Sequence, residues 1–234
     1  MIHAAIESLA RAKVETDPFL HAWVDDFLPQ SFAAALATEF PSLDGIDWDL
    51  RHNSPEAREK VVCSTDSKFP PLIREALDTF HNNHFINALR KTMGVIEDLV
   101  VDPTHRGCGM HSTGPRGHVG IHSDSSRHPD RSLDQLLNLI LWLNDDWPDE
   151  YGGHLELWDR DAKSCRTKFA PILNRLVIFE TGTTCYHGHP YKLTCPVDRR
   201  RNSLAVYYYQ AARATDDQHD GWREAPTFVT LDPI

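Results

Sequence analysis

The second half of the chain contains a series of short apolar or alternating segments with no helix-length pattern between them. The first is the apolar run 136–143, and the second is 152–158, in which polar and apolar residues alternate. Similar segments follow at 175–179, around His187 and at 201–209. Segments of this kind predict strands, and a succession of strands restricts the fold to a sandwich or barrel of sheets.

A His-x-Asp sequence, formed by His122 and Asp124, precedes this series, and His187 lies within it. Residues i and i+2 of a strand project to the same side, so His122 and Asp124 can share a metal ion where a strand ends. Two imidazoles and one carboxylate can occupy one face of an Fe(II) octahedron and leave the other positions open. The chain has 14 histidines, so the tripeptide alone is weak support for such a site.

Five motifs occur in order within residues 97–210. They are Gly117 to Asp124; Leu141-Trp142-Leu143-Asn144 with Trp147 and Gly152-Gly153; Asn174 to Phe179; His187-Gly188; and Arg201-x-Ser203-Leu204. In this order they resemble the prolyl 4-hydroxylase-like branch of the Fe(II)/2-oxoglutarate-dependent dioxygenases. Several ordered motifs are far more specific than one tripeptide.

The resemblance implies a role for four residues. In that family two histidines and an aspartate hold iron, and an arginine on the last core strand binds the far carboxylate of 2-oxoglutarate. These roles fall on His122, Asp124, His187 and Arg201. The implied cofactors are Fe(II), 2-oxoglutarate and O2, with ascorbate as an additional candidate. The implied reaction hydroxylates an unactivated C–H bond and releases succinate and CO2, with desaturation and ring closure left open.

Two of these assignments have rivals in the sequence. His189 lies two residues after His187 and would face the same way on a strand, but His187 directly precedes a glycine, as the ligand of the family precedes a small residue. The 14 positions from His187 to Arg201 exceed the usual spacing of the family, so Arg199 and Arg200 compete for the carboxylate. We favour Arg201 because it begins the last strand in the register of the family.

Further residues are expected to bind 2-oxoglutarate. Ser203 shares a strand face with Arg201. Trp142 takes the place of a family tyrosine that assists with the same carboxylate, and its indole N–H can donate one hydrogen bond. His111 takes the place of another family tyrosine, although an ordinary strand histidine is an equal alternative. Asn138 is an amide in an apolar strand, so we expect it to find partners in the cosubstrate pocket.

We therefore expect a mainly β (α+β) fold. Its core would be a double-stranded β-helix, a cupin-like jelly roll of two facing sheets, with flanking N-terminal helices. The 234 residues suit a single Fe(II)/2-oxoglutarate dioxygenase domain. Within it, residues 1–95 would form helical support and loops, and residues 97–210 the jelly-roll core.

The N-terminal region predicts three helices. Apolar spacing predicts one within residues 2–13, a cap at Ser31 predicts another up to about Phe40, and the pair Pro70-Pro71 predicts a third that ends near Leu89. Residues 41–69 resemble a long polar loop. The polar tail would dock back through Trp222, Phe228 and Val229.

The composition excludes several classes of protein. The net charge of −10, from 24 basic and 34 acidic residues, argues against a nucleic-acid partner. Five cysteines without a Cys-x-x-Cys pair argue against a disulfide framework and a zinc ribbon. No apolar run is long enough to cross a bilayer, so we expect a cytoplasmic protein without a membrane partner.

The substrate is the least determined part of the prediction. Arg116, Arg127, Arg131, Arg199 and Arg200 flank the proposed site, either as a cationic mouth for an anionic substrate or as a solvated rim. We favour a small-molecule substrate or one resembling an amino acid. The alternatives are a peptidyl, prolyl-type hydroxylase and a jelly-roll metal-binding protein without oxygenase activity. The oligomeric state is left open.

Overall fold

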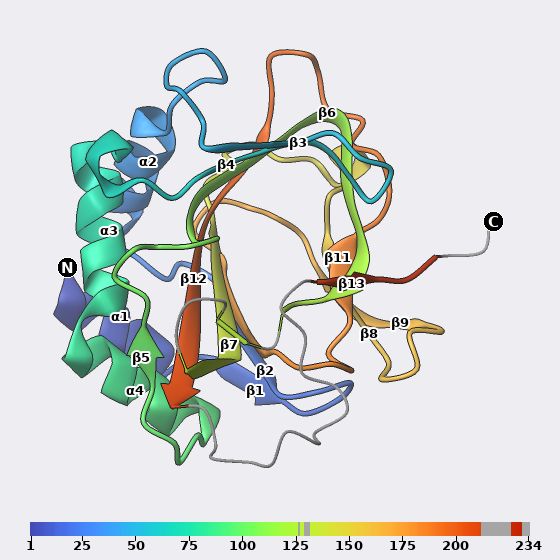
Figure 1. Cartoon of the computed structure of the whole chain (residues 1–234). Coiled ribbons are helices and arrows are strands. Elements are labelled where there is room, and N and C mark those ends of the chain that lie inside the picture. The colour runs from blue at the N-terminus through green and yellow to red at the C-terminus, as the bar shows by residue number, and fades with distance from the viewer. Residues whose placement is uncertain (126, 129–131, 212–225, 231–234) are drawn as a thin grey trace.

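A strongly curved sheet with helices packed against one side forms the body of the protein (Figure 1). The structure is a computed structural model and describes residues 1–125, 127–128, 132–211 and 226–230. The curled, mainly β architecture with N-terminal helices agrees with the prediction. Within the described ranges, no helix has the length and apolar character needed to span a membrane.

The strands form one continuous path of antiparallel neighbours. In order, these are β1 (Lys13–Glu15), β2 (His21–Val24), β10 (Leu176–Glu180), β7 (Leu133–Trp142), β12 (Arg201–Ala211), β6 (Gly109–Ser123), β11 (His187–His189), β8 (Leu155–Trp158) and β9 (Cys165–Phe169). Four strands lie beside this path. β4 (Ala57–Cys63) and β13 (Thr227–Phe228) pair with β6, β3 (Leu50–His52) pairs with β4, and β5 (Val100–Val101) pairs with β12.

The long strand β6 connects two opposite walls of the curved sheet, one that contains β12 and one that contains β11. Its first part pairs with β12 through residues 109–113, and its last part pairs with β11 through Val119 and His122. Between these parts the chain bends at Gly114–Gly117, where a Cβ on Gly117 would lie 2.7 Å from the carbonyl oxygen of Arg58. Figure 1 shows β6 crossing above β12 and then descending beside β11. The end of β6 therefore lies on the wall opposite its beginning.

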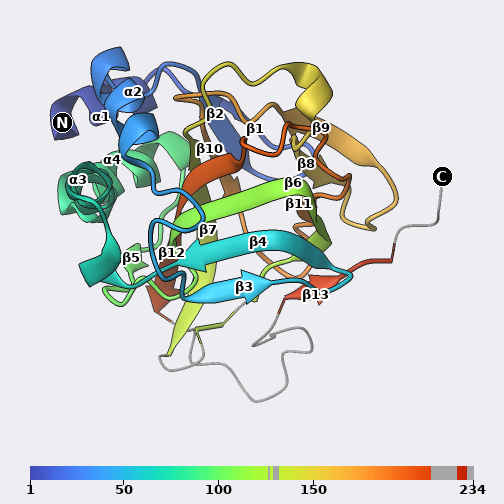
Figure 2. The same cartoon turned by 90° about the horizontal axis from the view of Figure 1, so that it is seen from above.

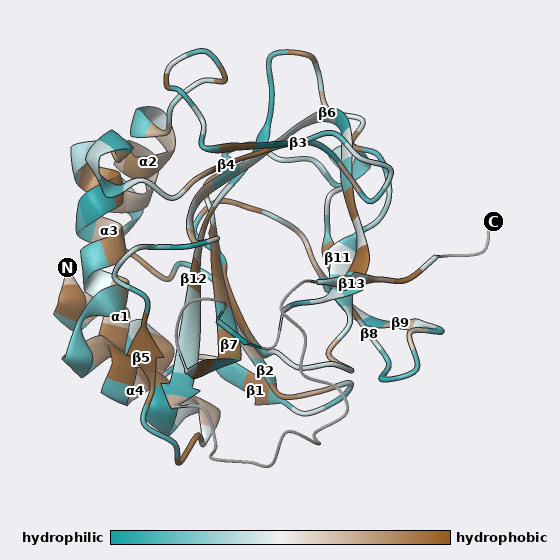
Figure 3. Cartoon of the chain, in the orientation of Figure 1, coloured by the Kyte–Doolittle hydropathy of each residue, from teal (hydrophilic) through white to brown (hydrophobic). Residues whose placement is uncertain are grey.

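Helices cover the outer face of β7 and β12. They are α1 (Ile2–Leu9), α2 (Gln30–Glu39), α3 (Pro71–His81) and α4 (Asn83–Met93), with short 3-10 turns at Asp66–Lys68 and Asp149–Tyr151. Figure 2 shows the four helices together on one side of the sheet, and Figure 3 shows hydrophobic residues along β7 and in the helices beside it. The residues of the two strands that enter this core are Leu137, Leu139, Leu141, Leu204, Val206 and Tyr208. The alternate residues, including Asn138, Trp142 and Ser203, therefore point into the enclosed space.

Three predictions for the N-terminal region were wrong. The expected helix ending near Leu89 is divided into α3 and α4, because Asn82 is extended (φ −73°, ψ 134°) and its side chain accepts a 2.9 Å hydrogen bond from the amide of His84. Helix α2 begins after Pro29, and Ser31 does not cap it. The expected loop 41–69 contains the hairpin of β3 and β4, whose apolar signal is interrupted by three charged residues, 58–60.

The C-terminal tail docks as predicted where it is described. Phe228 in β13 pairs with His122 in β6, and the amide of Val229 donates to the carbonyl oxygen of Ile121 at 2.8 Å. Trp222 lies outside the described residues. The tail therefore covers the end of β6 that carries the His-x-Asp sequence.

Candidate active site

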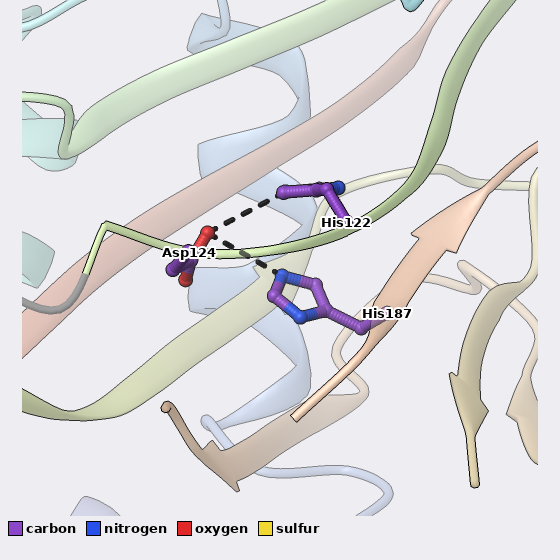
Figure 4. Close-up of side chains that lie close together, drawn as sticks. All are labelled: His122, Asp124 and His187. Carbon is purple, nitrogen blue, oxygen red and sulfur yellow. Dashed lines mark ion pairs between the residues drawn. The ribbon is translucent and has the colours of Figure 1, made fainter. Parts of the chain in front are cut away.

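Three side chains from the His-x-Asp sequence and β11 converge in the enclosed space (Figure 4). His122 in β6 pairs directly with His187 in β11, and Asp124 follows the end of β6. One carboxylate oxygen of Asp124 lies 3.4 Å from Nε2 of His122 and 3.6 Å from Nε2 of His187. The possible ligand atoms all lie within 4.8 Å of one another. The structure thus brings together the three residues that the sequence selected as metal ligands.

Backbone carbonyls fix the orientation of both imidazoles. Nδ1 of His122 lies 2.9 Å from the carbonyl oxygen of Gly120, and Nδ1 of His187 lies 3.1 Å from that of Cys185. A carbonyl oxygen only accepts hydrogen bonds, so each Nδ1 carries the proton. Each Nε2 then keeps a lone pair directed at the shared space, which is the arrangement common to metal-bound histidines.

Two amides of β7 hold the carboxylate of Asp124. Its second oxygen accepts hydrogen bonds from Nε2 of Gln135 at 3.0 Å and from Nδ2 of Asn138 at 3.2 Å. Residues three apart on a regular strand face opposite sides, but β7 has a bulge at Leu136 that directs both amides inward. Gln135 was not predicted from the sequence for this reason. Asn138 contacts Asp124 and is not among the residues that line the cavity, and its expected contact with 2-oxoglutarate stays a prediction.

Burial and mutual attraction determine the charges of this cluster. Burial lowers the pKa of His122, and the nearby His187 adds to the fall. Burial alone would raise the pKa of Asp124, but the neighbouring imidazoles of His187 and His122 hold that pKa well below its ordinary value. One carboxylate and two imidazole lone pairs form the facial donor set of non-haem Fe(II) sites. The residues present therefore fit an iron ion.

His189, the rival of His187, does not join this cluster. The groups of possible ligands in the described residues include His187 and exclude His189, which is buried, with Nδ1 lacking a partner there. Gly188, which follows His187 and distinguished it from His189 in the sequence, is required for a steric reason. A Cβ on Gly188 would lie 2.5 Å from the carbonyl oxygen of Gly120, so β11 can approach β6 closely only with glycine at this position.

Arg201 begins β12 as a buried cation. Its Nε donates a 2.7 Å hydrogen bond to the carbonyl oxygen of Gly153, and its guanidinium carbon lies 5.5 Å from the ring centre of Trp142. A Cβ on Gly153 would lie 2.9 Å from Cδ of Arg201, so this glycine leaves room for the side chain. Burial lowers the pKa of Arg201 to about 9. In the described part of the chain, Arg201 has no carboxylate partner and the indole N–H of Trp142 has no acceptor.

Arg199 and Arg200, the alternatives to Arg201, form hydrogen bonds with other segments. The guanidinium of Arg199 donates to the carbonyl oxygens of Asp145 and Asp146. Nε of Arg200 donates to the hydroxyl of Ser112 at 2.8 Å, and a terminal nitrogen donates to the carbonyl oxygen of Glu59. Both side chains therefore attach the loop before β12 to neighbouring segments.

A cavity of about 390 Å³ reaches two of the three triad residues, His122 and Asp124, and His187 is not among its lining residues. Its lining includes His122 and Asp124, together with Lys60, His111 and Tyr207. Nε2 of His111 lies 2.9 Å from the carbonyl oxygen of Gly107, and burial lowers the pKa of this imidazole to about 3, so it is neutral. Sequence reasoning missed Lys60, because it lies in the segment that was predicted to be a loop.

Ser203 and the flanking arginines complete the predicted residues. Ser203 is buried and lies between His111 and Trp142 in the sheet. Arg127 lines the cavity but pairs with the buried Asp134 at 3.4 Å, and Arg116 is exposed and absent from the cavity lining. Arg131 lies outside the described residues.

The model of the 2OG-Fe(II) oxygenase superfamily matches residues 108–209. No curated protein matches the chain in sequence.

Among solved structures, a prolyl-4-hydroxylase from Pseudomonas putida is similar, with 20% identity, a TM-score of 0.57 and coverage of 90% of this chain and 99% of that chain. A prolyl hydroxylase from Trichoplax adhaerens, solved with a hypoxia inducible factor oxygen degradation domain peptide fragment, has 13% identity, a TM-score of 0.57 and 89% coverage of each chain. HygX from Streptomyces hygroscopicus, solved with nickel, 2-oxoglutarate and hygromycin B, has 12% identity, a TM-score of 0.52 and coverage of 88% of this chain and 92% of that chain.

These structures show that the fold is a jelly roll of the oxygenase type. The family match spans β6 to β12 and includes the triad and Arg201. Residues 108–209 therefore form a domain that matches the 2OG-Fe(II) oxygenases, which are iron- and 2-oxoglutarate-dependent enzymes, and the fold of the chain is that of the prolyl hydroxylase structures.

Proposed function

We propose that this oxygenase holds Fe(II) with His122, Asp124 and His187, binds 2-oxoglutarate through Arg201, and hydroxylates a small molecule that enters the cavity over the triad. Fe(II), 2-oxoglutarate and O2 together supply the oxidation of the C–H bond. The protein residues position the reactants and exclude water.

The observation that carries this proposal is the pair formed by Arg201, which has no carboxylate partner among the described residues, and Trp142, whose indole N–H has no acceptor there. A buried cation without a carboxylate partner and a buried N–H without an acceptor are both costly. They lie side by side, with the guanidinium carbon 5.5 Å from the indole ring centre. A carboxylate placed there can accept from both groups, and the fork of an arginine can bind it through two parallel hydrogen bonds. The far carboxylate of 2-oxoglutarate meets this requirement.

Aromatic rings shield the iron ligands from water. The ring of Phe228 stacks at 5.0 Å on His122, and the ring of Phe179 lies 4.5 Å from that of His187. The hydrogen bonds from Gln135 and Asn138 hold one oxygen of the triad carboxylate, which leaves the other oxygen for the metal. These residues therefore orient the ligands before the metal binds.

The dimensions of the cavity favour a small molecule. Its volume of about 390 Å³ lies within the roughly 300–1,000 Å³ range of small-molecule sites. β3, β4 and β13 contribute lining residues, so the cavity has walls on several sides. HygX, one of the similar structures, holds the small molecule hygromycin B, whereas the Trichoplax adhaerens enzyme holds a peptide.

The arginine assignment is tested by anaerobic titration of 2-oxoglutarate into the Fe(II)-loaded protein, with the visible charge-transfer absorption as the readout. Removing one partner of a buried charged pair costs roughly 2–5 kcal/mol, which is about 30-fold to several-thousand-fold in affinity. We expect Arg201→Ala to lose that much affinity for 2-oxoglutarate while keeping Fe(II). The matched variants Arg199→Ala and Arg200→Ala should change it only a few-fold. Normal affinity in Arg201→Ala would remove the assignment.

The substrate class is tested by succinate release from 2-oxoglutarate in the presence of separate pools of metabolites and of proline-containing peptides. Mass spectrometry then identifies the compound that gains one oxygen atom. Turnover with a metabolite supports the proposal, and turnover with peptides alone would replace it with a peptidyl hydroxylase.

A further inference from the structure

Lys60 projects into the same enclosed space as Arg201. In the sheet, Lys60 of β4 lies opposite Thr113 of β6, and Thr113 lies opposite Arg201 of β12. Directly paired residues of antiparallel strands project to the same side, at Cα separations of roughly 4.5–5.5 Å. The two cations therefore arise from one row across the sheet, with their backbones about 10 Å apart.

The two cations occupy different environments within this row. Arg201 is buried against Gly153 and Trp142 and is absent from the cavity lining. Lys60 is partly buried and lines the cavity with His122 and Asp124. Arg201 is thus suited to bind the far carboxylate of 2-oxoglutarate in the protein interior. Lys60 is suited to bind a charged group of a molecule that enters through the cavity.

Lys60 lacks a counter-ion among the residues that the structure describes. No hydrogen bond or salt bridge joins it to any of them. Burial lowers the pKa of Lys60 to about 8, with Asp124 opposing the fall and Arg201 adding to it. The ammonium group is therefore still mainly charged at neutral pH, and an anion bound beside it would remove an electrostatic cost.

The cofactors do not supply this anion. Fe(II) brings two positive charges and Asp124 one negative charge, so with Lys60 and Arg201 the site has an excess of three positive charges. The dianion 2-oxoglutarate removes two of them and leaves one. Asp124 is the only acidic residue among the described residues that line the cavity, and the other lining arginines, Arg106 and Arg127, already have partners.

We propose that Lys60 binds a carboxylate of the primary substrate, so that the enzyme acts on a small aliphatic carboxylic acid. The apolar lining residues Leu50, Val62, Val119 and Phe228 provide the surface for the aliphatic part. The carboxylate at Lys60 and the hydrocarbon on these residues would direct a C–H bond toward the triad. This inference rests on the proposed function, because it assigns 2-oxoglutarate to Arg201.

The test compares hexanoate with hexanamide, which have the same hydrocarbon chain and differ in charge. Binding is measured by calorimetry to the Fe(II)-loaded protein under anaerobic conditions, with and without saturating 2-oxoglutarate. A hydrogen bond to a charged group contributes about 1.5–3 kcal/mol, roughly 10- to 150-fold in affinity. We therefore expect the wild-type protein to prefer hexanoate by at least about tenfold.

Variants assign this preference to Lys60. Lys60→Met and Lys60→Gln should abolish the preference, Lys60→Arg should retain most of it, and the exposed control Lys91→Met should leave it unchanged. The affinity for 2-oxoglutarate should change by less than about threefold in Lys60→Met, because Arg201 remains. Circular dichroism checks that each variant folds.

Four outcomes overturn the inference, and the first three concern the binding of hexanoate. These three are no measurable binding of hexanoate, equal binding of acid and amide, and a preference for the acid that survives in Lys60→Met and Lys60→Gln. A loss of 2-oxoglutarate affinity in Lys60→Met as large as in Arg201→Ala also overturns it, since Lys60 would then bind the cosubstrate. The proposed function fails separately if the Fe(II)-loaded wild type does not bind 2-oxoglutarate. In that case the comparison of hexanoate with hexanamide in the absence of 2-oxoglutarate still decides the role of Lys60.

Discussion

Replacing Lys60 with methionine should stabilise the protein in the absence of ligands. Lys60 is a partly buried cation with no hydrogen bond or salt bridge among the described residues. Methionine has a similar length without the charge, so Lys60→Met removes the cost of desolvating the ammonium group. A residue retained at a cost in stability is expected where function requires it.

The size of the effect follows from the pKa of Lys60. Burial lowers this pKa from 10.5 to about 8, and each pKa unit corresponds to about 1.36 kcal/mol, which gives roughly 3 kcal/mol as an upper limit. The side chain is partly exposed, so solvent screening reduces the expected gain in unfolding free energy to about 1–2 kcal/mol. For a protein of this size that gain raises Tm by a few degrees.

The gain should depend on pH in a defined direction. Below about pH 8 the lysine is charged in both the folded and the unfolded protein, so the wild type carries the full cost. Between about pH 8 and pH 10.5 the folded lysine loses its proton while the unfolded one keeps it, so the cost falls. The stability difference between Lys60→Met and wild type should therefore be largest at neutral pH and shrink toward pH 10.5.

Urea unfolding of the metal-free and ligand-free protein, followed by tryptophan fluorescence at several pH values, measures this difference. Lys60→Arg should show no gain, because the charge remains, and Lys91→Met serves as the exposed control. A Lys60→Met variant that is less stable than wild type at neutral pH, or a gain that stays constant up to pH 10.5, would refute the reasoning.

Three further predictions concern the triad and its neighbours. His187→Ala should abolish turnover and greatly weaken Fe(II) binding with the fold retained, while His189→Ala should weaken Fe(II) binding less. Calorimetric titration with Fe(II) measures both affinities, and a larger loss in His189→Ala would make His189 the ligand. Asn138→Ala and Gln135→Ala should each lower Fe(II) affinity by about 10- to 100-fold in the same titration, as expected for groups that orient a ligand, and unchanged affinity would limit both amides to a structural role. Trp142→Phe should lower 2-oxoglutarate affinity by about tenfold or more, because it removes one hydrogen bond to a carboxylate and keeps an aromatic ring; an unchanged dissociation constant would show that the indole N–H does not contact the cosubstrate.

The features that the sequence predicted well have local signals. The strand segments in the second half of the chain show the period-two or continuous apolar pattern that sheet burial requires. The His-x-Asp pair depends only on the alternation of side chains along one strand, so its geometry could be predicted without the rest of the fold. The glycine after His187 also has a local effect, because it sets how closely β11 approaches β6.

The features that the sequence missed depend on contacts between distant segments. Lys60 belongs to a hairpin whose strand pattern is visible only once β4 is paired with β6. Gln135 reaches Asp124 because of a bulge in the pairing of β7 with β12, and nothing in the residues around it specifies that bulge. The break at Asn82 has a local cause instead, since the side chain of Asn82 caps α4 through the amide of His84 and divides one predicted helix into two.

The bend of β6 has a consequence for altering the range of substrates. His111 and His122 lie on opposite sides of this bend, at the two ends of one continuous strand. The span between the walls of the cavity is therefore set by the main chain at Gly114 and Gly117, where added Cβ atoms would meet the side chain of Arg200 and the backbone of Arg58. Substitutions at Gly114 or Gly117 would change the angle between the two walls of the cavity and displace the iron ligands together. Attempts to admit bulkier molecules should leave the corner intact and shorten the side chains of Val62 or Leu50 instead.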